Sequence, residues 1–341
     1  MNTQPALPDW AYAYGGAQSQ GMIRKTPDDF IVNEIQSFDL SGVGEHAFLL
    51  IEKCGENTEF VARSLARFAG VRQRDVSYAG LKDRHARTRQ WFSVWLPGKP
   101  DPDWSALNSD SIKVLQATRH SRKLKRGSLA GNQFILRIQD YQGDKAILEQ
   151  QLQAIKEQGV PNYFGEQRFG RGGANVARAL ALFAGEKISR AQRGMYLSAA
   201  RSYLFNHILS ARVVDKSWNQ ALVGDALMFD DSHSFFQAEV LDASILQRLA
   251  QLELHPTTVL WGKGELQVAG EVALLEQQII EQFADLAKGL IAFGMEQDRR
   301  ALRSHVKELQ WDFIADDCLQ LRFSLNAGCY ATAVLREIVR V

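Results

Sequence analysis

Cysteine is scarce in this chain of 341 residues, where Cys54, Cys318 and Cys329 are the only three. Three scattered cysteines do not make a disulfide framework, and no basic segment followed by an apolar one opens the sequence, so no signal peptide is expected. The 7 histidines and 3 cysteines do not fall at metal-ligand spacings. No apolar run approaches the roughly 20 residues of a membrane-spanning helix. We therefore expect a cytoplasmic protein without a membrane or a metal as partner.

The common nucleotide and hydrolase motifs are also missing. Gly165 and Gly170 have the spacing of a P-loop, but Arg171 and Gly172 stand where Lys and Ser or Thr are needed. No G-x-G-x-x-G opens a helix after a strand, and there is no G-x-S-x-G elbow. These absences disfavour nucleotide hydrolysis, dinucleotide binding and serine-hydrolase chemistry.

Positive and negative charges balance over the whole chain but not within its segments. The 40 Lys and Arg residues against 39 Asp and Glu leave a net charge of +1. Residues 1–50 carry −4 and the last 201 residues carry −3, whereas residues 51–140 carry +8. This excess fits a local positive surface for a polyanion, although a solvated helix face gives the same pattern.

The hydrophobic pattern predicts strands first, helices next and a strand near the end. Period-2 or short apolar runs predict strands at 30–35, 47–51, 76–78, 90–96, 134–138 and 319–325. Helical spacing predicts helices near 61–68, 176–183, 197–213, 272–293 and 330–339, and a core stripe of Ile147, Leu148, Leu152 and Ile155. The composition is that of a folded chain of one or two domains. A sheet domain interrupted by a mostly helical insertion is the simplest interpretation.

The polar loop 80–90, GLKDRHARTRQ, contains a single carboxylate, Asp83, among several cations. A lone acid on a loop between two strands, surrounded by cations, suits a carboxylate nucleophile that acts on an anionic substrate. The alternative is a surface loop whose aspartate is neutralised by its neighbours. In that loop, Lys82 and Arg84 are candidate ligands of RNA phosphates.

The basic run 119–126 leads into a glycine-rich turn that ends in Asn132 and Phe134. An amide and an aromatic ring can read the edge and the face of a base, although Phe134 is equally a candidate core residue of a strand. The run itself contains the candidate phosphate ligands Arg122, Lys123 and Lys125.

The segment 160–173, VPNYFGEQRFGRGG, is aromatic, basic and rich in glycine. Its backbone can approach RNA closely, with Arg168 and Arg171 on phosphates, or it is a plain turn between domains.

Six segments resemble the TruD family, tRNA pseudouridine synthase D, in the right order. The most specific is YAGLKDRHARTRQW at 78–91. The others are RKTPDDFIVNE at 24–34, KLKRGSLAGNQF at 123–134, VPNYFGEQRFG at 160–170, LSAARSYLFN at 197–206 and NAGCYATAVLREI at 326–338. The resemblance thus covers nearly the whole chain.

The resemblance implies an α+β fold: a pseudouridine-synthase catalytic domain with a mixed, mostly antiparallel sheet, interrupted by a largely helical insertion domain. We place the catalytic domain at residues 1–158 and 307–341 and the insertion at 159–306. The implied activity is isomerisation of uridine, at position 13 of tRNA, to pseudouridine. No cofactor or metal is implied, the partner is tRNA, and a monomer is expected.

By the same matching, Asp83 is the catalytic aspartate, and Phe30, Asn132 and Tyr330 surround the target uridine. Arg24 and Phe134 complete the predicted substrate-binding set. Two positions depart from the family pattern: Arg24 stands where a lysine is usual, and Tyr330 where phenylalanine is expected.

The chemistry requires the target nucleotide to be flipped out of its stack, and aromatic contacts can offset the cost of about a few kcal/mol. An ionised Asp83 can then attack C1′ or C6, stabilise charge at C1′, or remove a ribose proton, and the sequence leaves these routes open. Two other functions also use these residues: a tRNA-binding or chaperone protein without catalysis, and a hydrolase that admits water to the site.

Overall fold

The computed structural model describes residues 7–341, and the chain forms two compact units. We call the first the sheet unit, made of residues 19–143 and 307–328 with the last residue, and the second the helical unit, made of residues 7–18, 144–306 and 329–340. The chain therefore crosses between units near 18, 143, 306 and 328. The domain boundaries predicted at 158 and 306 refer to the domains of the family rather than to these compact units, and they stay a prediction.

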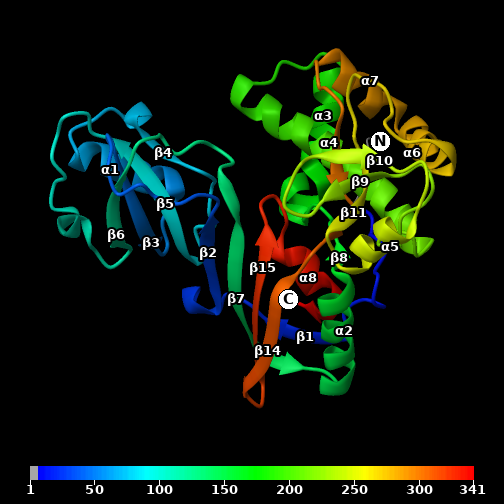
Figure 1. The fold of residues 1–341 in the computed structure, drawn as a ribbon, viewed down its shortest axis with the longest axis horizontal. Helices are drawn as coiled ribbons and strands as arrows, with labels where there is room; N and C mark the ends of the chain where they lie inside the picture. Colours follow the sequence, from blue (N-terminus) through cyan, green and yellow to red (C-terminus); the bar gives the residue numbers. More distant parts are fainter. Residues whose placement is uncertain (1–6) are drawn as a thin grey trace. The chain divides into compact units, whose positions relative to one another are not determined.

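The sheet unit is built on a mixed, mostly antiparallel sheet with the order β14-β15-β7-β2-β5-β3-β6, to which β1 adds beside β7 and β4 beside β5 (Figure 1). Only β2 and β5 run parallel to each other in this order. Its strands are β1 (Ser19–Met22), β2 (Phe30–Gln36), β3 (His46–Lys53), β4 (Val76–Tyr78), β5 (Arg87–Trp95), β6 (Ile112–His120), β7 (Leu129–Gln142), β14 (Lys307–Ala315) and β15 (Cys318–Asn326).

One face of this sheet is covered by α1 (Thr58–Phe68). The period-2 pattern of β3 places Ala47, Leu49 and Ile51 on that face, fully buried. From α1, Val61 and Leu65 enter the same core at helical spacing. Leucine and isoleucine side chains buried to this extent contribute about 1.5–3 kcal/mol each. This packing holds the strands that carry the polar loop predicted at 80–90.

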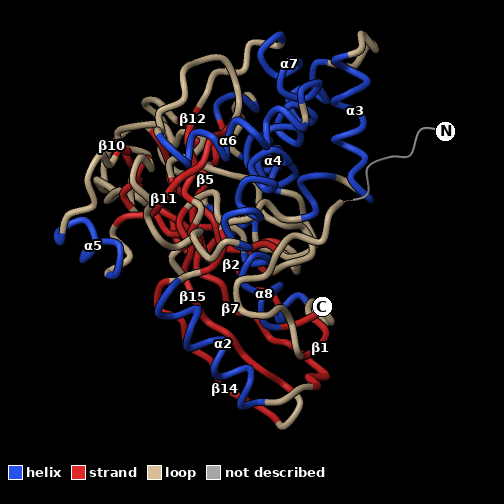
Figure 2. The backbone as a smooth tube through the Cα atoms, turned by 90° about the vertical axis from the view of Figure 1, so that its right-hand side faces the viewer, coloured by secondary structure: helices blue, strands red, loops and turns tan. Residues whose placement is uncertain are grey.

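The helical unit contains most of the long helices, and α3, α4, α6 and α7 lie on one side of its strands β9 to β12 (Figure 2). The helices are α2 (Lys145–Gln158), α3 (Ala174–Phe183), α4 (Arg190–Val214), α5 (Ala243–Ala250), α6 (Gly270–Gln282), α7 (Ala284–Ala292) and α8 (Ala331–Ile338). Its strands are β8 (Val160–Pro161), β9 (Ala226–Phe229), β10 (Phe235–Gln237), β11 (Leu254–Leu260), β12 (Asp298–Ala301), β13 (Arg303–Ser304) and β16 (Val339–Arg340).

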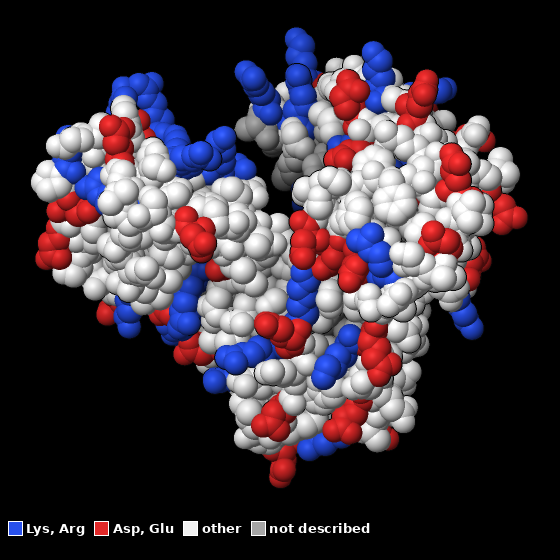
Figure 3. Space-filling model, viewed as in Figure 1, with Lys and Arg blue, Asp and Glu red and all other residues white. Residues whose placement is uncertain are grey.

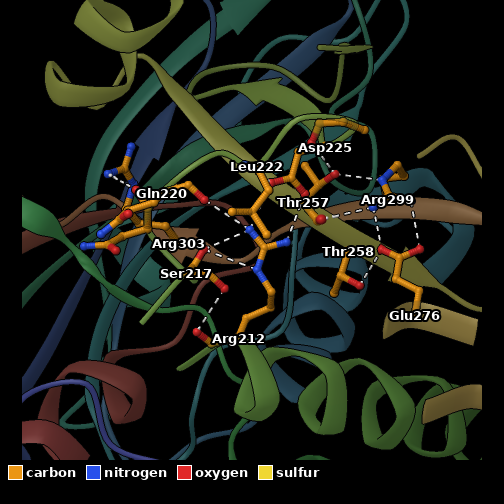
Figure 4. Close-up of polar contacts among 12 residues, drawn as sticks. Arg212, Ser217, Gln220, Leu222, Asp225, Thr257, Thr258, Glu276, Arg299 and Arg303 are labelled. Atoms are coloured by element: carbon orange, nitrogen blue, oxygen red, sulfur yellow. Dashed lines mark hydrogen bonds and ion pairs between the residues drawn. The ribbon is translucent and has the colours of Figure 1, made fainter. Parts of the chain in front are cut away.

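Strands β10-β9-β11-β12 form an antiparallel sheet that was not predicted from the sequence pattern. Buried arginines tie this sheet to the helices: Arg212 of α4 pairs with Asp225 at 2.9 Å, and Arg299 of β12 with Glu276 of α6 at 2.7 Å (Figure 4). Removing one partner of such a pair typically costs about 3–5 kcal/mol, because the other charge is left buried. These pairs therefore fix how the strands meet the helices within this unit.

The strand and helix predictions are confirmed at 30–35, 47–51, 61–68 and 319–325, with two local corrections. Ile147 is exposed, whereas Leu148, Leu152 and Ile155 are buried as predicted. The run 272–293 is two helices, because the backbone leaves the helical conformation at Phe283. Within the described part of the chain, no helix is long and apolar enough to cross a membrane.

Candidate active site

Asp83 lies on the loop between β4 and β5, and each of its carboxylate oxygens has one donor. The Arg24 guanidinium donates to Oδ2 at 2.8 Å and the backbone N–H of His85 donates to Oδ1 at 2.9 Å. The Asp83 side chain is 32% exposed and that of Arg24 35%. The carboxylate is therefore anchored but still reachable from solvent. The loop is shorter than predicted, because Arg87 already belongs to β5.

Hydrogen bonds from neighbouring elements fix the backbone of this loop. Gln90 donates to the carbonyl of Gly80 at 3.1 Å, and the N–H of Lys82 donates to the hydroxyl of Thr58 at 3.0 Å. The Thr58 hydroxyl donates in turn to Gln90. Thr58 and Gln90 are both buried, so the loop rests on a polar pair inside the unit.

Lys53 holds the backbone of Asp83 itself. Its side chain is fully buried, and Nζ donates to the Asp83 carbonyl at 2.8 Å. Burial lowers the pKa of Lys53 to about 8, against the charge of Asp83, which raises it. Strand β3 places Lys53 there, because Lys53 lies on the same buried face as Ala47, Leu49 and Ile51, at every second residue.

Arg24 also covers an aromatic ring. Its guanidinium carbon lies 4.2 Å from the centroid of the Phe30 ring. Phe30 is 4% exposed and meets Phe134 edge to face at 6.4 Å, and Phe134 stacks on Phe323. Phe134 is thus a core residue here, which is the alternative that the sequence left open. Arg24 has a φ of +61°, a conformation uncommon outside glycine, so the surrounding structure holds its backbone in place.

Asn132 of β7 joins the same neighbourhood through Lys82. The Lys82 ammonium donates to Asn132 Oδ1 at 2.7 Å and pairs with Glu34 Oε2 at 3.0 Å. The side chains of Lys82 and Glu34 are 6% and 2% exposed. Glu34 Oε1 accepts from the backbone N–H of Trp91. Lys82 therefore points inward, and its predicted contact with RNA phosphates stays a prediction.

The other predicted phosphate ligands of the sheet unit are exposed. Arg84 donates to the carbonyl of Gly55 at 2.8 Å and Lys123 to that of Arg74 at 2.9 Å, while Arg122 and Lys125 lie in the exposed stretch after β6. Figure 3 shows Lys and Arg side chains gathered along the upper edge of the unit that holds β3 to β6. This surface suits a polyanion.

Tyr330, Arg168 and Arg171 belong to the helical unit. The Arg168 guanidinium donates to the Tyr330 hydroxyl at 2.6 Å and to the Ser198 hydroxyl at 2.9 Å. Tyr330 is partly buried and packs at 6.0 Å from the ring of Phe164. Arg171 is exposed in the short helix Arg171–Gly173. The hydroxyl that distinguishes Tyr330 from phenylalanine thus has a partner.

The family model for tRNA pseudouridine synthase D (TruD) matches residues 10–182 and 176–338 of this chain. The chain belongs to the TruD family. Two TruD relatives, each named tRNA pseudouridine synthase D, match along almost their full length. The Methylococcus capsulatus protein is 51% identical over 98% of this chain and 95% of its own. The Pseudomonas fluorescens protein is 50% identical over 96% and 93%.

The fold is likewise that of a TruD protein. A crystal structure described as that of a Methanosarcina mazei tRNA pseudouridine synthase D superposes with a TM-score of 0.73, at 22% identity, over 97% of this chain and 96% of that one. The predicted α+β class with a mostly antiparallel sheet is therefore confirmed.

In this TruD chain the sheet unit brings together Asp83, Arg24, Phe30 and Asn132, whereas Tyr330 belongs to the other unit. The sequence reading missed Lys53 and Glu34. Both carried a signal, since each is a charged residue at every second position after apolar residues of the same strand: Lys53 follows Leu49 and Ile51, and Glu34 follows Phe30 and Val32. Within residues 7–341, no group of three His, Cys, Asp or Glu side chains is arranged to hold a metal ion.

Proposed function

We propose that this chain isomerises a uridine of tRNA, at position 13, to pseudouridine, with Asp83 as the nucleophile. Membership of the TruD family supports the reaction class. The observation that carries the residue assignment is the reachable Asp83 carboxylate, held between Arg24 and the His85 N–H beside Phe30 and Lys82.

The reaction replaces the bond between ribose C1′ and uracil N1 with a bond between C1′ and C5. The Asp83 carboxylate adds to C1′ while the electron pair of the C1′–N1 bond leaves with uracil. The base then turns, C5 adds to C1′ and the carboxylate leaves. C5 loses its proton and N1 gains one, so uridine and pseudouridine have the same composition and no redox partner is needed.

A single carboxylate that is reachable from solvent suits this chemistry. Uracil leaves as a resonance-stabilised anion, so the acid that a glycosidase uses on its leaving group is not required. Water would hydrolyse the intermediate, and its exclusion keeps the base in the site. The neighbouring acids are already paired, Glu34 with Lys82 and Glu52 with Arg87 and Arg89.

The flipped base needs a surface to stack on. Flipped bases stack on aromatic rings or on guanidinium planes. The Phe30 ring is almost inaccessible beneath Arg24, so we assign the stacking surface of this unit to the Arg24 guanidinium supported by Phe30. An arginine there presents a plane that the lysine usual in the family lacks.

Incubation with an unmodified tRNA transcript tests the proposal against its two competitors. A synthase converts uridine to pseudouridine, a hydrolase releases free uracil, and a binding protein or chaperone does neither. We expect pseudouridine at position 13, no uracil release, and loss of the product when that uridine is replaced by cytidine. Released uracil, or binding without product, would refute the proposal.

A further inference from the structure

The hydrogen bond from Lys82 fixes the orientation of the Asn132 amide. An ammonium group has donors only, so the Asn132 atom that it meets at 2.7 Å must be the oxygen. The oxygen and nitrogen of this amide are therefore not interchangeable, unlike those of an asparagine at an ordinary surface. Nδ2 must lie on the other branch of the amide.

Lys82 is held in turn. Glu34 stands directly opposite Asn132 in the pairing of β2 with β7, and its Oε2 pairs with the ammonium. Its other oxygen accepts from the N–H of Trp91. With both side chains almost fully buried, rotation of Lys82 away from Asn132 would leave the Glu34 charge unpaired in the interior.

Nδ2 of Asn132 has no hydrogen-bond partner within the residues that the structure describes, and the residue is partly exposed. Oδ1 also keeps a second lone pair, because an amide oxygen accepts two hydrogen bonds. The side chain can therefore offer one donor and one acceptor, in a fixed order, to a base at this site.

We infer that Lys82 and Glu34 act as positioning residues that lock the Asn132 amide in the orientation that accepts uracil and rejects cytosine. This rests on the proposed function, in which a base enters beside Asp83. Uracil presents N3–H as a donor next to carbonyl oxygens as acceptors, which Oδ1 and Nδ2 match. Cytosine presents N3 as an acceptor next to the N4 amino donor, and matching it requires the amide to flip.

The locked amide also suits the turn of the base. The exchange of N1 for C5 corresponds to a half-turn of the ring about the line through N3 and C6. This half-turn exchanges O2 with O4 and leaves N3–H in place. Asn132 therefore meets the same donor and acceptor pattern before and after the turn, and one fixed orientation serves both uridine and pseudouridine.

The test compares the binding of two transcripts of one tRNA that differ only in uridine or cytidine at position 13. The Asp83→Asn background prevents turnover during binding. In that background we measure the ratio of the affinity for the uridine transcript to the affinity for the cytidine transcript. We compare this ratio between three proteins: one with no further change, one with Lys82→Met, and a control with Lys113→Met, whose lysine is exposed on β6. Any intrinsic difference between the two RNAs is common to all proteins and cancels between ratios.

We expect Lys82→Met to lower the preference for uridine about tenfold to a hundredfold, since a correctly paired bidentate contact discriminates by that much. Lys113→Met should leave the ratio unchanged. The slope of affinity against salt should stay the same in Lys82→Met, whereas a phosphate ligand would lower it by roughly 0.9. An unchanged ratio, with or without a smaller slope, would overturn the inference.

A second variant, Asn132→Asp, tests the inference in the same binding experiment without depending on the stability of Lys82→Met. The aspartate keeps an oxygen for Lys82 and turns the second branch from a donor into an acceptor, so the ratio should move towards cytidine. An unchanged ratio would overturn the inference. The same uridine transcript with Asp83 intact reports pseudouridine formation, and absence of product there would instead refute the proposed function.

Discussion

Replacing Lys53 by methionine should separate the stability of the sheet unit from its activity. Lys53 is fully buried, and its ammonium group donates the hydrogen bond that holds the Asp83 carbonyl. Its pKa falls from 10.5 to about 8 in the folded chain. Keeping the ammonium charged at pH 7 therefore costs about 3 kcal/mol relative to the unfolded chain, at about 1.36 kcal/mol for each tenfold change in the proton equilibrium.

The sign of the pH dependence follows from this lowered pKa. Between pH 8 and 10.5 the unfolded chain binds a proton at Lys53 that the folded chain has released, so stability from this group rises with pH. Between pH 7 and 9.5 about 2 kcal/mol of the cost should disappear. Lys53→Met has no such group, so the difference in free energy of unfolding between the two proteins should change by that amount.

Urea unfolding of both proteins at pH 7, 8 and 9.5 measures this difference, because all other titrating groups are shared and cancel to first order. Meanwhile pseudouridine formation should fall about tenfold or more in Lys53→Met, since the loop that positions Asp83 loses its anchor. A difference in unfolding free energy that stays flat across this range would refute the reasoning about Lys53. Full activity in the variant would refute its role in holding Asp83.

Three further changes, the first with a matched control, test other parts of the structure. Gly131→Ala should lower the free energy of unfolding by at least about 2 kcal/mol, because its Cβ would overlap the carbonyl oxygen of Leu325 on the paired strand. A matched Gly194→Ala in an exposed turn of α4, with open space around the new atom, should instead stabilise by up to about 1 kcal/mol. Tyr330→Phe should keep pseudouridine formation and lower stability by about 1 kcal/mol, because Arg168 loses one acceptor. Simultaneous substitution of Arg122, Lys123 and Lys125 by alanine should weaken tRNA binding and flatten the dependence of the affinity on salt. An unchanged slope of affinity against salt would place the RNA elsewhere.

The sequence was most informative where local pattern decides the outcome. The strands at 30–35 and 47–51 follow from short apolar runs, and the loop of Asp83 follows from a run of polar residues that cannot be buried together. The inward turn of Lys82 could not be predicted in this way. It depends on Glu34, 48 positions earlier in the chain, which reaches it only once β2 pairs with β5, the strand that follows the loop of Lys82.

The helical unit shows the same limit. Strands β9 and β10 are short, and α5 separates them from β11, so the helical runs around these strands dominated the periodicity. Their buried partners Arg299 and Glu276 look like ordinary surface charges until the fold brings them together. The break at Phe283 also escapes the pattern, because apolar spacing continues from one helix into the next.

The most direct test of the central claim is pseudouridine formation by Asp83→Asn on an unmodified tRNA transcript. The amide keeps the size of the side chain and the surrounding cations, so tRNA binding should remain close to that of the unaltered protein. Removal of the nucleophile should abolish pseudouridine at position 13, including under single-turnover conditions with enzyme in excess. Formation of pseudouridine at the unaltered rate by this variant would contradict the assignment of Asp83.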